Sequence, residues 1–190
     1  MMRDIADSVL RELEMFRHEK KHLLIAIDGR CAAGKTTLAA HLQKACGCNV
    51  IHMDYFFLRP VQRTAQRLNE PGGNVDYERF LREVLIPLKQ MEMFSYRPYD
   101  CHRQKLKEPV RVTPNPVNII EGSYSCHPAL HANYDLKIFL NVDTDEQLCR
   151  IRHRNGDMCI VQFQDKWIPL EEHYFSAYNI KNSCDLYFQT

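Results

Sequence analysis

The chain has 190 residues, enough to bury the core of one domain and too few for a second large one. Its 25 lysines and arginines against 24 aspartates and glutamates leave a net charge of +1, too little for the long-range field that nucleic-acid binding usually needs. Without a bilayer-spanning apolar run or a signal-peptide pattern, the sequence predicts a cytoplasmic protein with a small-molecule partner, no nucleic acid and no membrane.

The first part of the chain alternates between helical and strand patterns. Apolar residues at helical spacing predict an amphipathic helix over residues 5–16, and the apolar run at 22–28 predicts a buried strand. A glycine loop then leads into a second helix, after which residues 48–53 repeat the strand pattern and end at Asp54. The polar residues 59–73 that follow are predicted as an exposed loop.

Prolines divide the middle of the chain. Asp76 is a candidate N-cap for a helix that Pro87 is expected to end or kink. Short runs at 96–100 and 109–113, each marked by prolines, predict a hairpin inserted over about residues 95–114.

Further strands and two helices complete the pattern. A capping-box pattern at residues 144–147 predicts a helix that ends at Asn155-Gly156, and Pro169 suits the first turn of a last helix. Three more apolar runs are candidate strands: 117–121, 136–142 and 184–188.

Strands that alternate with helices predict one α/β domain over residues 1–190. Its central, mainly parallel sheet would be flanked by helices and would carry the small inserted hairpin and a lid. Ligands of such sheets bind outside the carboxyl ends of the strands, where the loop at 29–36, Asp54 and Glu121 are expected to converge.

The stretch Gly29-Arg30-Cys31-Ala32-Ala33-Gly34-Lys35-Thr36 matches G-x-x-x-x-G-K-[ST] in full and lies between a predicted strand and a predicted helix. In this context the backbone N–H groups wrap a phosphate, Lys35 neutralises its oxygens, and the Thr36 hydroxyl is placed for Mg²⁺. The pattern predicts a P-loop NTPase fold that binds ATP and Mg²⁺, with these ATP-binding residues: Gly29, Arg30, Cys31, Ala32, Ala33, Gly34, Lys35, Thr36 and Thr37.

Two carboxylates follow predicted strands. Asp54 could accept the proton of an attacking hydroxyl during γ-phosphoryl transfer or could cap a helix, and its aromatic neighbours and the nearby loop favour the catalytic interpretation. Glu121 closes an apolar strand in the manner of a Walker B acid, which orders Mg²⁺ through its water shell or contacts the acceptor. We therefore predict Asp54 and Lys35 as catalytic residues and Thr36 and Glu121 as the metal site.

Three arginines lie on the predicted helix before Asn155-Gly156. Arg150 and Arg154 are four residues apart and share a face, whereas Arg152 points elsewhere. We expect the first two to act in catalysis, from a lid over about residues 150–166. The alternative is an exposed charged face without a catalytic role.

Two other classes of function fit the sequence less well. A GTP-dependent switch would need an N-K-x-D guanine-reading motif and a D-x-x-G after a strand, and both are missing. An ATP-binding module without chemistry would not need Lys35, Thr36, Asp54 and Glu121 together. The sequence leaves open whether ATP is preferred over GTP and whether the chain forms a homo-oligomer.

Taken together, these motifs resemble those of the uridine kinase-like family of P-loop kinases. The resemblance covers most of the chain and is carried, in order, by residues 27–38, Asp54-Tyr55-Phe56, residues 74–77, residues 97–100, Ile120-Glu121-Gly122 and residues 150–154. It implies a P-loop kinase fold that uses ATP and Mg²⁺ to phosphorylate a nucleoside 5′-hydroxyl. Another alcohol, such as nicotinamide riboside, is the alternative acceptor.

The resemblance also implies roles for single residues. Asp54 would be the general base, Asp76 would hold ribose hydroxyls, and Tyr99 and His102 would line the base pocket. With Glu121 these make the predicted substrate-binding set: Asp54, Asp76, Tyr99, His102 and Glu121. Residues 59–73 and 101–103 depart from the family pattern. The resemblance therefore supports the fold and phosphoryl transfer more strongly than it supports the identity of the acceptor.

Overall fold

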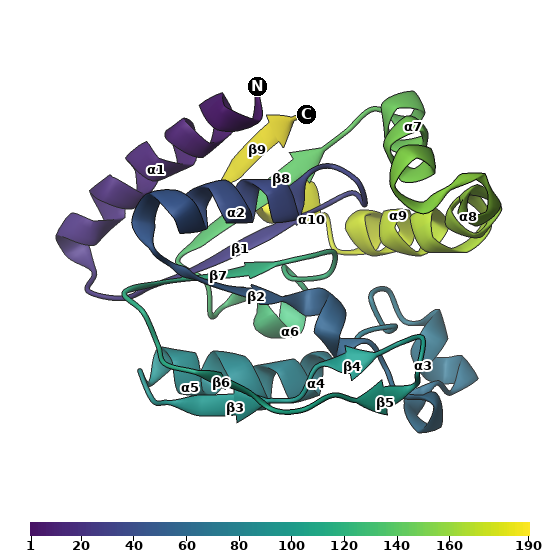
Figure 1. Cartoon of the computed structure of the whole chain (residues 1–190), viewed down its shortest axis with the longest axis horizontal. Coiled ribbons are helices and arrows are strands. Elements are labelled where there is room, and N and C mark those ends of the chain that lie inside the picture. Colours follow the sequence, from purple (N-terminus) through teal and green to yellow (C-terminus); the bar gives the residue numbers. More distant parts are fainter.

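A five-stranded sheet lies at the centre of the computed structural model, which describes residues 1–190 (Figure 1). The strand order is β2-β7-β1-β8-β9, and every neighbouring pair is parallel. The strands are β1 (Leu23–Gly29), β2 (Asn49–His52), β7 (Val117–Glu121), β8 (Leu136–Asn141) and β9 (Leu186–Gln189). The parallel sheet confirms the α/β architecture that the alternation of strands and helices predicts.

The strands turn alternate side chains into two separate cores. On β1, Ile25 faces α1 (Met2–Glu19) and α2 (Lys35–Cys46), whereas Ala26 faces the opposite side. Successive strand residues point to opposite faces, so a strand that is apolar throughout must be covered on both sides. The predicted amphipathic opening helix provides part of that cover.

Helices from several parts of the chain cover the other face of the sheet. Those that contribute buried side chains include α4 (Tyr77–Phe80), α6 (Pro128–His131), α9 (Ile168–Ala177) and α10 (Ile180–Ser183). Aromatic rings fill much of this core, and Phe56 meets Phe80 edge to face with 4.8 Å between ring centroids. Because both faces are enclosed, the carboxyl ends of the strands are the place for a site.

Two helices run on through a proline. Helix α4 continues through the π-helical turn Leu81–Leu85 into α5 (Ile86–Lys89), which contains Pro87. The last helix likewise begins before its proline, because α8 (Asp157–Gln162) and the π-helical turn Phe163–Trp167 lead into α9. A proline lacks an N–H and its ring crowds the preceding turn, and the wider π turn accommodates both. Pro169 therefore lies in the first turn of α9, as predicted, whereas Pro87 lies inside α5, which ends at Lys89.

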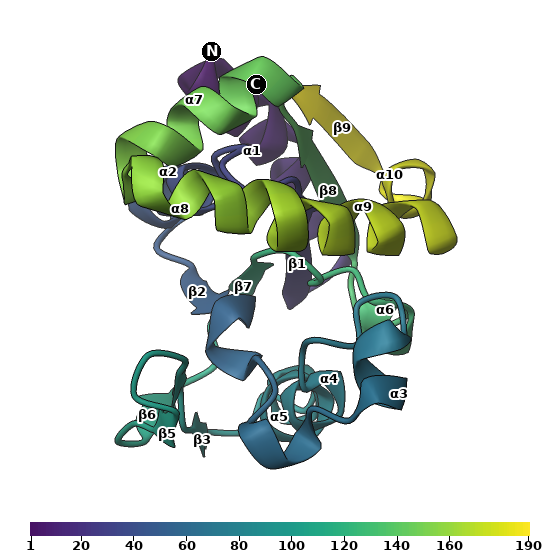
Figure 2. The same ribbon diagram turned by 90° about the vertical axis from the view of Figure 1, so that its right-hand side faces the viewer.

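Residues 57–112, called the lower layer below, lie beneath the sheet in Figure 2. They follow η1 (Met53–Phe56), the 3-10 turn after β2, and the part predicted as a loop contains the short helix α3 (Ala65–Asn69) after the 3-10 turn Pro60–Gln62. Within the range predicted as a hairpin, two antiparallel strand pairs form: β3 (Phe94–Tyr96) with β6 (Val110–Val112), and β4 (Tyr99–Asp100) with β5 (Lys105–Leu106).

Helix α7 (Thr144–Asn155) begins without its predicted capping box. Its N-cap residue is Asp143, and no side chain forms a cap hydrogen bond. Gln147, the expected partner in the box, is buried and donates from Nε2 to the carbonyl oxygen of Cys31 at 3.0 Å. A contact with the glycine loop therefore uses the side chain that the box would need. None of the helices is both long and apolar enough to cross a membrane.

Candidate active site

The loop between β1 and α2 needs glycine at two positions. Gly29 has a φ of +130° and Gly34 a φ of +90°, conformations that other residues rarely adopt. A Cβ atom on Gly29 would lie 2.0 Å from the carbonyl oxygen of Leu140 on β8. The first glycine thus permits two strands to approach, and the second turns the chain into α2, whose N-terminal N–H groups can hold an anion.

Lys35 is buried at the start of α2, and its ammonium group bonds to the loop itself. Nζ donates to the carbonyl oxygens of Gly29 at 2.6 Å and Arg30 at 2.8 Å, and to the Ser123 hydroxyl oxygen at 3.2 Å. One buried positive charge therefore lies beside the backbone N–H groups of the loop. Such an environment attracts phosphate.

Glu121 at the end of β7 joins two neighbouring elements. Its carboxylate accepts a hydrogen bond from the Thr36 hydroxyl, 3.2 Å from each oxygen, and another from Nδ1 of His52. His52 is the register partner of Glu121 on β2, so the second contact follows from strand pairing. The hydrogen bond to Glu121 raises the pKa of His52 above its usual value.

Thr36 and Glu121 are the two residues that the sequence predicts for a metal. No group of three His, Cys, Asp or Glu side chains is arranged to hold a metal ion. Mg²⁺ prefers oxygen ligands and usually binds through one or two protein side chains together with water and substrate phosphates. A hydroxyl and a carboxylate in contact fit this ion, and Thr36 and Glu121 would hold it.

Asp54 lies in η1, and its carboxylate forms no hydrogen bond or ion pair within the chain. A Cβ atom on Gly122 would come 3.3 Å from Oδ1 of Asp54, so this glycine leaves room for the carboxylate. Asp54 is exposed on one side, while the protein atoms around it displace part of its water shell and raise its pKa. The charges of Glu121 and Glu171 raise this pKa further, and the charge of Lys35 lowers it. An unpartnered carboxylate beside a buried lysine can accept a proton from a hydroxyl group.

Glu171 of α9 is a site residue that the sequence motifs missed. Its Oε2 accepts a hydrogen bond from the backbone N–H of Cys31 at 2.9 Å, and its Oε1 accepts one from the Ser123 hydroxyl at 2.5 Å. The adjacent Glu172 pairs with Arg30 at 2.7 Å. A carboxylate on a loop N–H occupies the position of an anion that such a loop binds. Two adjacent acids in the last helix are the only signal in the sequence.

The buried carboxylate of Asp28 ties this site together. It accepts hydrogen bonds from the backbone N–H groups of Gly29 at 2.7 Å, Tyr124 at 3.1 Å and Cys126 at 2.9 Å, and from the Tyr174 hydroxyl at 2.9 Å. Burial raises the pKa of Asp28 to about 6, while these hydrogen bonds act in the opposite direction. The loop, the segment after β7 and α9 are thereby held in one arrangement.

The two predicted lid arginines have different surroundings. Arg150 donates from Nη1 to the carbonyl oxygen of Ala32 at 3.3 Å and pairs with Glu146 at 2.7 Å, so it contacts the glycine loop. Arg154 is exposed and donates to Asn155 at 2.8 Å. Their shared role in catalysis stays a prediction, since only the first touches the loop.

The predicted acceptor residues lie in the lower layer. Asp76 accepts hydrogen bonds from the backbone N–H of Arg79 at 3.2 Å, as the predicted N-cap does, and from Gln62 at 2.8 Å. Tyr99 is buried on β4 with a hydroxyl that has no hydrogen-bond partner. His102 is exposed in the turn between β4 and β5. Their binding roles stay predictions, and the Tyr99 hydroxyl keeps bonding capacity for a ligand.

No protein-family model matches the chain, but solved structures are similar to it along almost its whole length. A possible uridine kinase from Bacillus stearothermophilus is 20% identical, with a TM-score of 0.75 and 98% of each chain covered. A candidate fructose transport system kinase from Silicibacter sp. TM1040 is 24% identical, with a TM-score of 0.70, 99% of this chain and 98% of that one. A Saccharomyces cerevisiae protein described as a candidate P-loop kinase with a circular permutation is 11% identical, with a TM-score of 0.62, 100% of this chain and 99% of that one.

Proposed function

We propose that this chain, which has the fold of the P-loop kinases, transfers the γ-phosphate of ATP to a hydroxyl group of a small molecule. The proposal is carried by one observation: Asp54 and Lys35 meet the same short segment after β7, where Oδ1 of Asp54 is 3.3 Å from the Cβ position of Gly122 and Lys35 bonds to Ser123 at 3.2 Å. Kinase chemistry needs a bound phosphoryl donor, positive charge for the transferred group, and a residue that takes the hydroxyl proton. The loop, Lys35 and Asp54 meet these three needs.

In the proposed reaction, residues 29–37 bind the β- and γ-phosphates through backbone N–H groups. Asp54 takes the proton of the acceptor hydroxyl. The hydroxyl oxygen of the acceptor bonds to the γ-phosphorus while the bond from the γ-phosphorus to the β–γ bridging oxygen breaks, which releases ADP. Lys35 neutralises charge on the transferred group, aided by the predicted lid residues Arg150 and Arg154. Thr36 and Glu121 would hold Mg²⁺, which when bound supplies further positive charge to the same phosphates.

The acceptor in this proposal is a small alcohol. The resemblance to uridine kinase-like proteins favours a nucleoside 5′-hydroxyl, with Asp76, Tyr99 and His102 as the residues around the sugar and the base. The similar structures are described as a possible uridine kinase and a candidate fructose transport system kinase. Nucleosides and sugars therefore both belong among the acceptors to be tested.

The test is ADP release from MgATP by the purified protein with uridine, cytidine, nicotinamide riboside, pantothenate, ribose and fructose in turn. We expect an acceptor to stimulate release, and Asp54→Asn to lower kcat by on the order of 10²- to 10⁴-fold without loss of ATP binding, because an amide cannot take the proton. Asp7→Asn, at an exposed position of α1, is the matched control and should keep full activity.

Two results would contradict parts of this proposal. ATP binding with no acceptor-stimulated release, for these compounds and for the charged ones named below, would indicate a binding module without transfer chemistry. If acceptor-stimulated ADP release is unchanged in Asp54→Asn, Asp54 is not the base, while the kinase function still stands.

A further inference from the structure

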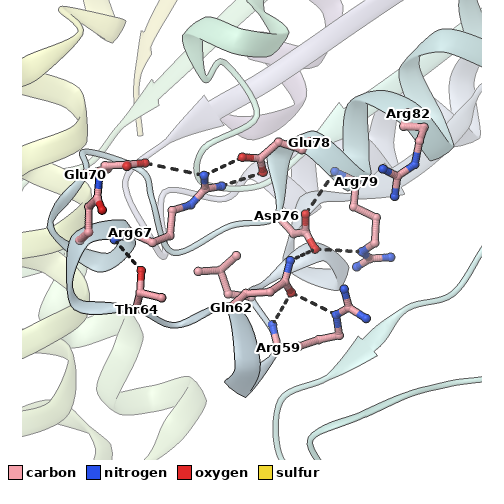
Figure 3. A pocket seen from close by; sticks show the side chains of 11 residues that line it. Arg59, Gln62, Thr64, Arg67, Glu70, Asp76, Glu78, Arg79 and Arg82 are labelled. Atoms are coloured by element: carbon pink, nitrogen blue, oxygen red, sulfur yellow. Dashed lines mark hydrogen bonds and ion pairs between the residues drawn. The ribbon is translucent and has the colours of Figure 1, made fainter.

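A polar cavity of about 480 Å³ lies in the lower layer, away from the glycine loop (Figure 3). It opens between the segment that follows η1 and the helix that starts at α4. Of its eleven lining residues only Leu58 is hydrophobic. Its volume is that of a small-molecule site, and its lining indicates a ligand that is recognised by charge and hydrogen bonds.

The acidic side chains of the cavity already have partners. Glu70 and Glu78 both pair with Arg67, at 3.7 Å and 2.6 Å, and Asp76 lies 3.5 Å from Arg79. Glu83, which lies outside the lining, pairs with Arg79 at 3.2 Å and with Arg82 at 3.7 Å, so Arg59 is the one arginine of the lining that has no ion pair.

Arg59 differs from these residues because it forms no ion pair. Its Nε donates to the uncharged side chain of Gln62 at 3.0 Å, and the Gln62 amide in turn donates to Asp76 at 2.8 Å. The amide therefore fixes Arg59 beside Asp76 without neutralising its charge. Arg59 therefore lines the cavity without a direct ion pair.

The guanidinium groups of Arg59 and Arg79 point to the same end of the cavity in Figure 3. The Arg79 side chain is only 6% exposed, and its Nε has no hydrogen-bond partner, although the Asp76 carboxylate lies 3.5 Å from it. Burial lowers the pKa of Arg79, the carboxylates of Glu83 and Asp76 oppose this, and the nearby charge of Arg59 adds to the lowering. Like charges held together with a buried donor unsatisfied cost stability, and this arrangement is typical of an anion site.

This end of the cavity is next to the predicted base. Arg79 donates from Nη2 to the carbonyl oxygen of Tyr55, the residue after Asp54, and from Nη1 to that of Arg97, each at 3.1 Å. Its guanidinium group thus lies between the turn that carries Asp54 and the strands of the hairpin. The cavity is thus joined to the turn that carries Asp54 through the hydrogen bond from Arg79 to Tyr55.

We propose that the acceptor carries an anionic group, a phosphate or a carboxylate, which Arg59 and Arg79 bind while Asp54 faces its reacting hydroxyl. Guanidinium groups form their strongest hydrogen bonds with these two anions. Asp76 borders the same cavity and can accept a hydrogen bond from a second hydroxyl. The acceptor class is therefore a phosphorylated or carboxylated polyol, and only its reaction, not its binding, rests on the proposed kinase function.

Binding is measured first, by calorimetry on the ATP-free protein, with ribose 5-phosphate against ribose and glycerate against glycerol. The charged member of at least one pair should bind about tenfold more tightly or better, and the two pairs distinguish phosphate from carboxylate. Arg59→Gln should reduce this preference to less than about twofold, and Arg59→Lys should retain part of it. Arg111→Gln removes an equal charge from an exposed position of β6 and should leave the preference intact.

Equal binding of the charged and neutral members, a preference that survives Arg59→Gln, or no binding of any of the four compounds would overturn the anion site. ADP release with the same compounds is measured separately. If a charged compound binds in a way that depends on Arg59 and no acceptor stimulates ADP release, the anion site is supported and the kinase function is contradicted. Release stimulated by neutral acceptors alone would keep the kinase and overturn the anion site.

Discussion

The glycine loop and the cavity of the lower layer differ in how fully their polar groups are paired. In the loop, Lys35 has three hydrogen-bond partners and the N–H of Cys31 has the carboxylate of Glu171. In the cavity, Arg59 has no ion pair and the buried Nε of Arg79 has no hydrogen-bond partner. A loop that binds phosphate through its backbone can be held rigid by the chain, whereas a cavity that selects a ligand must keep free donors.

Lys35→Ala should have the largest effect and should fall on the loop alone. The change removes the buried charge that stabilises the transferred phosphoryl group, so kcat/KM should fall by on the order of 10³-fold. Binding of ribose 5-phosphate and glycerate in the cavity should stay within about twofold of the unaltered protein. ADP release and calorimetry on one preparation check both expectations, and a parallel loss of binding would mean that the two regions are one site.

The pH dependence of turnover tests the residue that lies between the two regions. The raised pKa of Asp54 keeps this base protonated up to a higher pH than the ordinary aspartate value of 3.8 allows. Turnover should therefore fall as the pH drops through that raised pKa, by about tenfold per unit below it. The measurement is kcat across the acidic range in which the fold persists.

Two variants show which group causes this fall of turnover at low pH, the acidic limb of the pH profile. It should be absent from the residual activity of Asp54→Asn and present in His52→Asn, because His52 also has a raised pKa and lies beside the site. Loss of the limb in His52→Asn would instead assign it to the histidine.

Glu171→Gln should have the smallest effect and the opposite sign. The carboxylate competes with phosphate for the N–H of Cys31, so removing its charge should tighten MgATP binding by about three- to tenfold in calorimetry. Glu172→Gln breaks the ion pair to Arg30, whose acid is half exposed, and should change the affinity by less than about twofold. Unchanged or weaker binding in Glu171→Gln would show that the carboxylate does not compete.

The sequence predicted those parts of the fold that depend on local spacing. The glycine loop was predictable because Gly29 and Gly34 must take positive φ values between a strand and a helix. The five parallel strands were predictable because a strand covered on both faces must be apolar throughout. The carboxyl ends of β1, β2 and β7 are adjacent in a parallel sheet, so the approach of Asp54 and Glu121 to the loop was also predictable.

Local spacing gave a wrong prediction where a side chain makes a distant contact. The capping-box pattern failed because Gln147 bonds to Cys31, which is 116 residues away. The π-helical turns before Pro87 and Pro169 were also not predicted, because the sequence carries no mark of such a turn.

By itself, the sequence determined the α/β fold and the glycine loop, because backbone conformation and strand burial follow from residues close together in the chain. Only the tertiary structure decided that Glu171, 140 residues from Cys31, reaches the loop. It also decided that Arg59 bonds to the uncharged Gln62 and forms no ion pair with a carboxylate. Which charges find partners depends on the packing of distant elements, and no short motif records that outcome.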